Sequence, residues 1–241
     1  MRYAVLSDIH GNLEALSAVL ADAAEHVDDV LCLGDVVGYG ADPGPCVDLV
    51  GARARAVVAG NHEHAVVGRL DLSWFNRYAR AAAEWTRERL DGDCASYLGA
   101  LPLTAVVGDA TLVHASPRQP QEWDYLVTEE DGLAAFAAFD TRLCFVGHSH
   151  VPAAWSLGSS GPDYARGEVS VTLDAGRRYI VNVGSVGQPR DRDPRAAYAV
   201  WDVDAKRVTV RRVAYDVATA RAKIEAAGLP RFLADRLAAG A

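Results

Sequence analysis

The chain has 241 residues, half of them apolar, and a formal net charge of −8 at pH 7. That length suits one α/β domain over residues 1–241, and the acidic balance excludes broad electrostatic binding to nucleic acid or to an anionic membrane surface. No apolar run approaches the roughly 18 residues of a membrane span, the four cysteines form no CxxC pair, and the first strand begins at once, so we expect a cytoplasmic protein without a signal peptide.

The first part of the chain alternates between predicted strands and helices. Apolar runs rich in β-branched residues predict strands at 3–6, 30–33 and 55–58. Helical spacing of apolar residues predicts a helix over 12–24 with Asn12 as its cap, and Pro43 opens a short helix. This alternation implies parallel strands whose active residues gather at the carboxyl ends.

Residues 64–100 predict a helical excursion that leans on the sheet. Aromatic and small side chains recur there at three- and four-residue steps, with charged side chains on the other face. The members of this stripe are Trp74, Phe75, Tyr78, Ala82 and Trp85. Such a stripe is more often part of a core than a ligand surface, so we expect its rings to be buried.

From Leu103 onward the pattern changes to strands. The predicted strands are 103–107, 110–114, 142–147, 152–157, 168–173, 179–183, 196–203 and 206–213. Turn residues at 108–109 and 204–205 predict two hairpins, whereas segment 158–167 is predicted to be a mobile loop. The predicted helices are 128–138, capped by Thr128, then 216–227 and 230–239. Two sheets in one domain account for this pattern.

Polar clusters follow five of the predicted strands. They are Asp8-Ile9-His10, Gly34-Asp35, Gly60-Asn61-His62-Glu63, Val113-His114 and Gly147-His148-Ser149-His150, and they hold five of the seven histidines. Delivered to one rim of the sheet, Asp8, Asp35, Asn61 and four of the histidines are the oxygen and nitrogen ligands of a two-metal site. Because no thiolate is among them, they suit Mn, Fe, Ni or Zn.

Spacing and residue type suggest how these ligands share the ions. Residues i and i+2 of a strand project to one face, so Asp8 can act with His10, and the pair His148 and His150 repeats that geometry. The Asp35 carboxylate can bridge two ions, whereas a neutral imidazole cannot. Two carboxylates, two divalent ions and a bridging hydroxide leave a charge of roughly +1, which suits a phosphodiester anion.

The ordered motifs D-x-H, GD, GNHE, H and GHSH within residues 5–150 resemble those of the calcineurin-like metallophosphoesterases. The segment NVGSVGQPR at 182–190 resembles the N-x-GS strand end of their small bacterial and archaeal phosphodiesterase-type members. The resemblance implies an αββα fold, a two-sheet β-sandwich flanked by helices, with the metals at one edge. It implies that Asp8, His10 and His150 bind one ion, that Asn61, His114 and His148 bind the other, that Asp35 bridges them, and that His62 protonates the leaving oxygen.

The chain departs from one pattern of this superfamily. Its protein phosphatases and dinucleoside tetraphosphate hydrolases carry GD-x-x-D-R-G, whereas Gly38-Tyr39 stand here where that pattern has Asp-Arg. A monoester dianion needs a further cation, which Arg190 or Arg118 could only partly supply, whereas Tyr39 offers a ring and a hydroxyl to a second ester group.

We therefore predict a phosphodiesterase that hydrolyses small or cyclic nucleotide-type diesters by attack of the metal-bridging hydroxide. The alternatives are a phosphomonoesterase, acting on nucleotides or on phosphoproteins, and a binding module that has lost turnover. Four neighbours of the clusters keep two interpretations each. Trp123 and Tyr125 stack on a base or pin a loop, His64 lines the pocket or caps a helix, and Glu63 starts a helix or supports a ligand.

Overall fold

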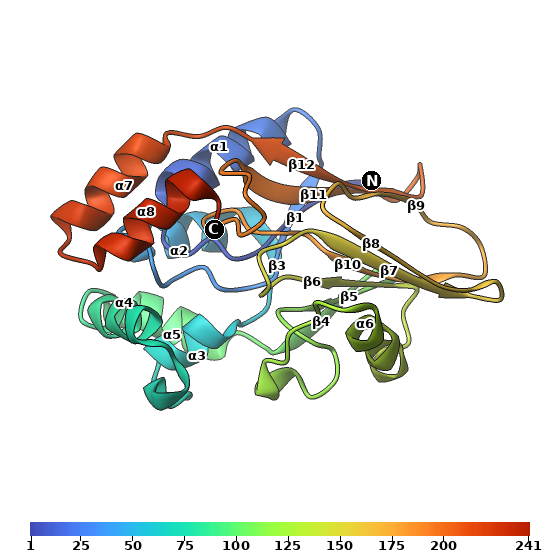
Figure 1. Ribbon diagram of the computed structural model, residues 1–241, viewed down its shortest axis with the longest axis horizontal. Helices are drawn as coiled ribbons and strands as arrows, with labels where there is room; N and C mark the ends of the chain where they lie inside the picture. Colours follow the sequence, from blue (N-terminus) through green and yellow to red (C-terminus); the bar gives the residue numbers. More distant parts are fainter.

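The computed structural model describes residues 1–241 and contains two six-stranded sheets that face each other (Figure 1). The first sheet has the order β3 (Ala54–Val57), β2 (Asp29–Cys32), β1 (Arg2–Leu6), β11 (Ala196–Asp202), β12 (Arg207–Val213) and β9 (Ser170–Thr172). The second has the order β4 (Thr104–Val107), β5 (Ala110–Val113), β6 (Leu143–Val146), β10 (Arg178–Asn182), β7 (Ala153–Gly158) and β8 (Gly161–Arg166).

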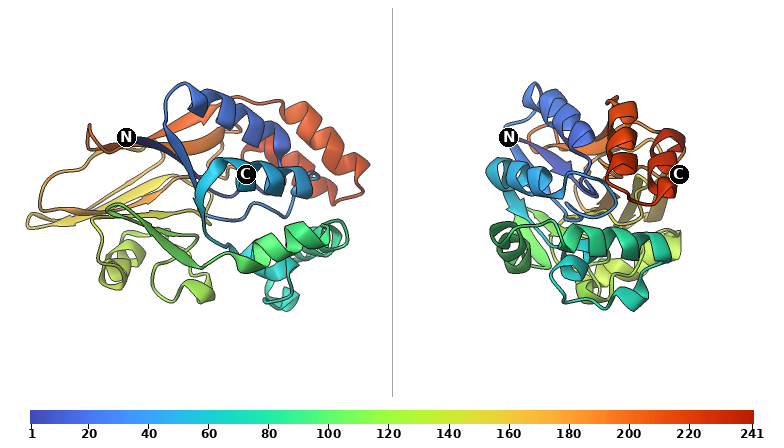
Figure 2. Two further views of the ribbon diagram at one scale, coloured as in Figure 1. Left: turned by 180° about the vertical axis from the view of Figure 1, so that it is seen from behind. Right: turned by 90° about the vertical axis from the view of Figure 1, so that its left-hand side faces the viewer.

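Eight α-helices surround the two sheets. They are α1 (Leu13–Ala24), α2 (Pro43–Arg53), α3 (Asn61–Val66), α4 (Arg77–Arg87), α5 (Gly92–Ala100), α6 (Glu129–Ala135), α7 (Val217–Ala226) and α8 (Arg231–Ala239). Helices α1 and α2 pack on the outer face of the first sheet and α6 on that of the second, which confirms the predicted αββα sandwich. Viewed end-on, α4, α7 and α8 lie around one end of the strands (Figure 2). No helix is both long and apolar enough to cross a membrane.

The two-residue repeat of the strands divides the core into layers. In β1, Val5 lies between the sheets with Leu31 and Phe145, whereas Ala4 and Leu6 pack outward beneath α1. Both faces of such a strand are buried, which is why its sequence is a continuous apolar run rather than an alternating one. All four cysteines are buried and free.

Parallel pairing brings the carboxyl ends of several strands together. β1 pairs with β2 and β2 with β3 in parallel, and in the second sheet β5 pairs with β6 and β6 with β10 in parallel. The five polar clusters leave from the ends of β1, β2, β3, β5 and β6. The topology therefore places them at one edge, as the strand pattern predicted.

The prediction of a mobile loop at 158–167 is wrong. Most of that segment forms β8, which pairs antiparallel with β7 from Ala153 and Arg166 to Gly158 and Gly161. The composition of this segment suggested a loop, but β8 is an edge strand. Proline has no amide hydrogen to donate, and an edge strand tolerates a residue such as Pro162 because one side of the strand has no partner. Trp155 and Tyr164 lie opposite each other with ring centroids 5.2 Å apart, a cross-strand pair that supports the hairpin.

The prediction of a buried aromatic stripe is wrong for Trp74 and only partly confirmed for Phe75, Tyr78 and Trp85, which are half-buried. Helix α4 begins only at Arg77, because the side chain of Asn76 accepts hydrogen bonds from the amides of Tyr78 and Ala79 and caps it. Trp74 lies in the short 3₁₀ turn before that cap and is 80% exposed. The remainder of 64–100 is helical as expected, and the caps at Asn12 and Thr128 and both predicted hairpins are present.

Candidate metal centre

The predicted ligand residues lie just beyond the strands and not on them: Asn61 is the first residue of α3, and the others lie in loops. β1 ends at Leu6 and β6 at Val146, so the predicted i, i+2 strand geometry is wrong for both His-containing pairs. Five of the seven predicted ligands have left-handed backbone angles instead: φ is 54° at Asp8, 52° at His10, 50° at Asp35, 63° at His148 and 60° at His150. Each such residue costs on the order of 1 kcal/mol. The surrounding contacts must hold them there, and the turns aim the side chains at one centre.

The first group of ligands comprises Asp8, His10 and His150. Asp8 Oδ1 lies 3.1 Å from His150 Nε2 and 3.7 Å from His10 Nε2, and all three side chains are buried. The other oxygen of Asp8 accepts a hydrogen bond from the His148 amide at 2.9 Å. One carboxylate oxygen is thereby held by the backbone while the second faces the imidazoles.

The second group comprises Asp35, His114 and His148. Asp35 Oδ2 lies 3.3 Å from His114 Nε2, which lies 3.1 Å from His148 Nδ1. The same oxygen of Asp35 is 3.7 Å from His10 Nε2 in the first group, so Asp35 stands between the two groups. The Oδ1 atom of Asn61 is buried without a hydrogen-bond partner.

Backbone carbonyls orient three of the imidazoles. Nδ1 of His10 lies 3.1 Å from the carbonyl oxygen of Val37, Nδ1 of His114 lies 2.9 Å from that of Leu33, and Nδ1 of His150 lies 2.6 Å from that of Gln188. A carbonyl oxygen only accepts, so each Nδ1 carries the proton and each Nε2 presents a lone pair. The tautomer needed for metal binding is set by the fold.

These ligand atoms fit divalent cations. The Nε2 atoms of His10 and His150 face each other at 3.2 Å, and Asp8 Oδ1 has no hydrogen-bond partner. Acceptors brought this close repel one another unless a cation lies between them. Burial favours the neutral form of the Asp8 carboxyl, but His150 and His114 hold its pKa below its ordinary value, so a carboxylate faces this centre.

Glu63 supports the loop that carries Asp35. Its buried carboxylate accepts hydrogen bonds from four backbone amides, those of Asp35, Val36 and Gly60 at 2.7 Å and that of Val37 at 3.3 Å. Of the two interpretations of Glu63, the structure thus shows both: it lies in the first turn of α3 and braces a ligand loop.

His62 lies against the ligands without a partner for its Nδ1 atom. Its amide donates to Asp35 Oδ1 at 2.9 Å, and the side chain is 3% exposed. Burial lowers the pKa of His62 to about 4, and an anionic phosphate beside it would oppose that shift. The rings of Tyr39 and Phe75 pack on His62 with centroids 4.6 and 4.9 Å away.

The structure separates the three candidate substrate residues. Arg190 lies at the centre: its amide donates to the carbonyl oxygen of His150 at 3.2 Å, and its guanidinium lies 5.8 Å from the Tyr39 ring. Tyr39 in turn lies 4.5 Å from the His10 ring. Arg118 lies elsewhere, with its side chain 58% exposed and an Asp124 oxygen 3.7 Å away.

Sequence reasoning missed two residues near Arg190. The side chain of Gln188 accepts a hydrogen bond from Arg190 Nη2 at 3.1 Å, and its place in the NVGSVGQPR segment was the available signal. Arg236 comes from α8, and burial together with the nearby Arg190 lowers its pKa to about 10. The sequence pattern of the C-terminal helices does not indicate that Arg236 lies near Arg190.

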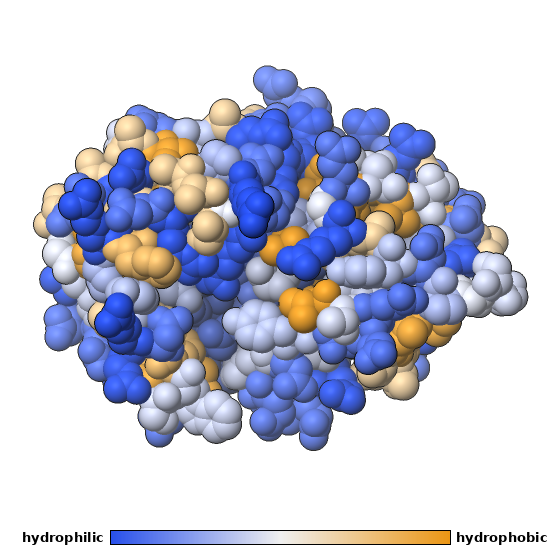
Figure 3. Space-filling model, in the orientation of Figure 1, coloured by the Kyte–Doolittle hydropathy of each residue, from blue (hydrophilic) through white to orange (hydrophobic).

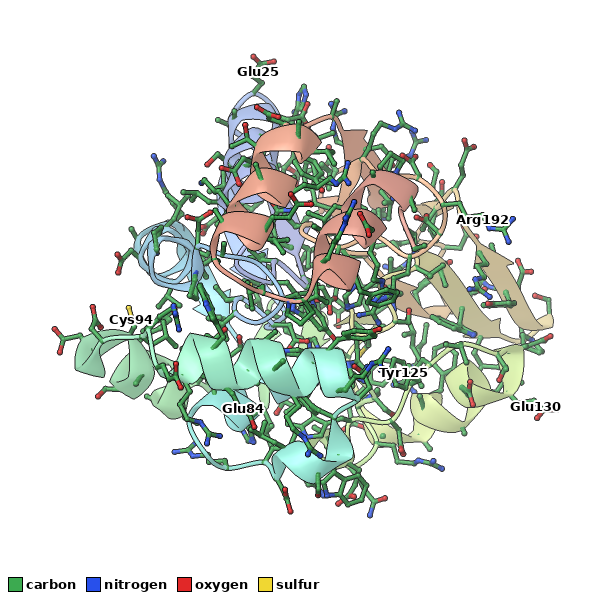
Figure 4. The ribbon with its side chains drawn as sticks, turned by 60° about the vertical axis from the view of Figure 1, so that its left-hand side comes forward. Glu25, Glu84, Cys94, Tyr125, Glu130 and Arg192 are labelled. Atoms are coloured by element: carbon green, nitrogen blue, oxygen red, sulfur yellow. The ribbon has the colours of Figure 1, made fainter.

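A cavity of about 230 Å³ opens beside the ligands. Its lining includes Asn61, His62 and His148 together with aromatic side chains from three other segments. Tyr125 stacks on His148 with ring centroids 4.1 Å apart, and in Figure 4 it lies near one end of α4, below α7 and α8. The surface is hollowed between the helical end of the molecule and the sheets (Figure 3).

Comparison with known proteins agrees with this geometry. A family model described as a calcineurin-like phosphoesterase superfamily domain matches residues 1–206. An uncharacterized protein of Methanocaldococcus jannaschii is 38% identical over 243 residues, covering 98% of this chain and 97% of its own. The crystal structure of a metallophosphoesterase from Sphaerobacter thermophilus is 46% identical, with a TM-score of 0.87 over 100% of this chain and 99% of its own. A hypothetical protein from Pyrococcus horikoshii shares the fold, with a TM-score of 0.79 at 21% identity over 100% of this chain and 98% of its own.

Proposed function

Since the chain belongs to the calcineurin-like phosphoesterase superfamily, a metal-dependent family, we propose that it is a phosphodiesterase with two divalent ions of Mn, Fe, Ni or Zn. Its substrates are small or cyclic nucleotide-type diesters. The observation that carries the proposal is the meeting of two buried ligand groups at Asp35, whose Oδ2 lies 3.3 Å from His114 Nε2 and 3.7 Å from His10 Nε2. A shared carboxylate between two groups supports two ions rather than one.

The residues of the chain divide the chemistry among them. Asp8, His10 and His150 would hold one ion and Asn61, His114 and His148 the other, with Asp35 shared between the two groups. The chemistry that these ions would supply when bound is activation of a water molecule as nucleophile and neutralisation of charge on the phosphate. His62, buried beside Asp35, donates a proton to the leaving oxygen.

Charge around the site favours a diester. Two carboxylates leave part of the charge of two divalent ions for the substrate, and one diester charge matches that remainder. Tyr39, 8% exposed, stands against His10 and His62, where it can contact the second ester group.

One observation favours a phosphomonoesterase as the second candidate. Arg190 lies beside His150, and its Nε atom is buried without a hydrogen-bond partner. A guanidinium with a free donor can take the second charge of a monoester dianion.

The deciding experiment compares kcat/KM for bis-(p-nitrophenyl) phosphate with that for p-nitrophenyl phosphate on the Mn-loaded protein at neutral pH. The proposal expects the diester to be the better substrate, and it expects Arg190→Ala to affect the monoester more strongly. A clear preference for the monoester assigns the protein to the phosphatases. Absence of turnover of both esters with every metal tried would leave the binding module as the function.

A further inference from the structure

The cavity beside the ligands has walls that the metal chemistry does not require. Besides Asn61, His62 and His148, its lining contains five aromatic side chains from three segments. They are Tyr39, then Trp74 and Phe75 before α4, and Trp123 and Tyr125 after β5. Ligand pockets for drug-sized molecules span roughly 300–1,000 Å³. A cavity of about 230 Å³ suits one flat ring system.

The indole ring of Trp74 has no aromatic partner in this cavity. It is 80% exposed, although the aromatic pattern of its segment is that of a core, and it stands on a 3₁₀ turn fixed by the cap from Asp71 to the Ser73 amide at 2.8 Å. An indole held out to solvent on a fixed turn offers a whole face for stacking. Base–aromatic stacking contributes roughly 1–3 kcal/mol per base.

Trp123 forms another part of the wall and is held firmly. Its backbone has a φ of 59°, and its ring meets those of His64 and His114 edge-on, with centroids 5.1 and 6.1 Å away. Tyr125 is fixed on His148 in the same way, by a stack at 4.1 Å. These rings are therefore positioned before any ligand arrives.

The polar groups of the cavity distinguish between ring systems. Glu122 contributes the one carboxylate of the lining, which also includes the amide side chain of Asn76. A carboxylate accepts hydrogen bonds from amino groups such as N4 of cytosine, but it faces the O4 acceptor of uracil or thymine unfavourably. A phenyl ring or an alkyl group would leave Glu122 without a donor.

We propose that this cavity binds the nucleobase of a nucleotide ester, with Trp74 and Trp123 as stacking walls and Glu122 as the acceptor for an amino-bearing base. Because His62 and His148 share the lining, a base held there keeps its sugar and phosphate at the ligand cluster. This base site names the substrate class of the proposed function. Base binding itself does not require hydrolysis, and only the identity of the cleaved ester rests on the proposed function.

Nucleosides test the cavity separately from hydrolysis because they carry no phosphate. Binding of cytidine, uridine and ribose to the Zn-loaded protein is followed by saturation-transfer NMR titration. We expect cytidine to bind more tightly than uridine, and ribose to show no saturable binding. Equal signals from cytidine and ribose would overturn the base site.

Three variants locate the binding. Trp74→Ala is expected to weaken cytidine binding roughly 5-fold or more. Glu122→Gln is expected to reduce the preference for cytidine over uridine roughly 3- to 10-fold, the usual net range for one hydrogen bond in an open site. Phe232→Ala removes an aromatic ring of α8 that is 45% exposed and outside the cavity lining, and it should leave nucleoside binding unchanged.

The outcomes separate the two proposals. Nucleoside binding that depends on Trp74, in a protein that prefers monoesters, keeps the base site and changes the ester class. Diester hydrolysis without nucleoside binding keeps the function and removes the base site. Cytidine binding that is unchanged in Trp74→Ala places the base outside this cavity and contradicts the inference.

Discussion

The Glu63 carboxylate accepts the amide of Asp35 at 2.7 Å, and the same oxygen accepts the amide of Gly60 at 2.7 Å. One side chain thereby ties the loop after β2 to the loop after β3. In turn, Asp35 Oδ1 accepts a hydrogen bond from the His62 amide at 2.9 Å. Each of the two carboxylates therefore holds the backbone of the segment that carries the other. The left-handed φ of 50° at Asp35 is held by this reciprocal arrangement.

Glu63→Gln should destabilise the protein by about 2–4 kcal/mol, because a carboxamide replaces one acceptor oxygen by a donor that faces backbone amides. Urea unfolding of the metal-free protein measures the loss. Glu84→Gln, an exposed change on α4 that is labelled in Figure 4, is the matched control and should stay within about 0.5 kcal/mol of the wild type. Equal stability of the two variants would contradict the bracing role.

Asp35→Ala should lose both metals, or most of one, because it removes a ligand that both groups share and leaves the repulsion between the ions less compensated. His64 is half-buried and contacts Trp123 rather than the ligands, so His64→Ala should keep both. Elemental analysis of the purified variants gives the metal content. Two metals per chain in Asp35→Ala would disprove the bridging assignment.

His62→Ala should lower the rate by roughly 10²–10⁴, the range for general acid catalysis, while the metal content stays near that of the wild type. The loss should be largest for esters with poor alkoxide leaving groups and smallest for nitrophenyl esters, whose leaving oxygen needs little protonation. Rates across a series of leaving groups test this. A uniform loss would show that His62 positions the substrate or the metals instead.

Strand runs and the order of the polar clusters were enough to predict the two sheets and the edge at which Asp8, Asp35 and His114 meet. Both features can be read from short stretches of sequence, because an apolar run followed by a polar ligand residue indicates a strand and the point where that strand ends. The left-handed backbone at Asp8 and His148 could not be predicted. Contacts with neighbouring loops impose this conformation, and the spacing of residues in the sequence contains no sign of those contacts.

The aromatic segment shows the same limit. Periodicity placed Trp74 on a buried face, but the cap at Asn76 makes α4 begin at Arg77, three residues later, and the ring stays exposed. The pairing of β8 with β7 also depends on partners distant from the turn that suggested a loop. Cross-element contacts of this kind, like the place of Arg236 beside Arg190, are set by tertiary structure.

Asp22 makes a contribution to stability that depends on pH. Its carboxylate accepts hydrogen bonds from Arg211 Nε and Nη2 at 2.9 Å and from the Tyr198 hydroxyl at 2.6 Å, which join α1 to β12 and β11. The hydrogen bonds from Arg211 are the main cause that lowers the pKa of Asp22 below its ordinary 3.8. A lowered pKa stabilises the fold above the unfolded value, and the contribution disappears as pH falls through the folded value.

Asp22→Asn should therefore cost about 1 kcal/mol at pH 6, a figure reduced for the partial exposure of the pair. The difference from the wild type should shrink as the pH falls below about 4. Urea unfolding between pH 7 and pH 3 follows it, with Asp235→Asn measured alongside as the surface control, since this carboxylate is half exposed and lies 3.1 Å from Arg221 and 3.7 Å from Arg231. A difference independent of pH would assign the effect of Asp22 to packing.

Gly38 sets the position of His62. A Cβ atom there would lie 2.2 Å from His62 Nδ1, and the φ of 91° disfavours any side chain. Gly38→Ala should displace the His62 imidazole and lower turnover of alkyl esters by at least about 10-fold, with a smaller effect on nitrophenyl esters, as for His62→Ala. Gly44→Ala in α2, where the added methyl meets nothing within 4 Å, is the control and should leave turnover unchanged. If Gly38→Ala keeps full activity on alkyl esters, the imidazole position at His62 does not govern protonation of the leaving group, because no alanine fits beside Nδ1 without moving it.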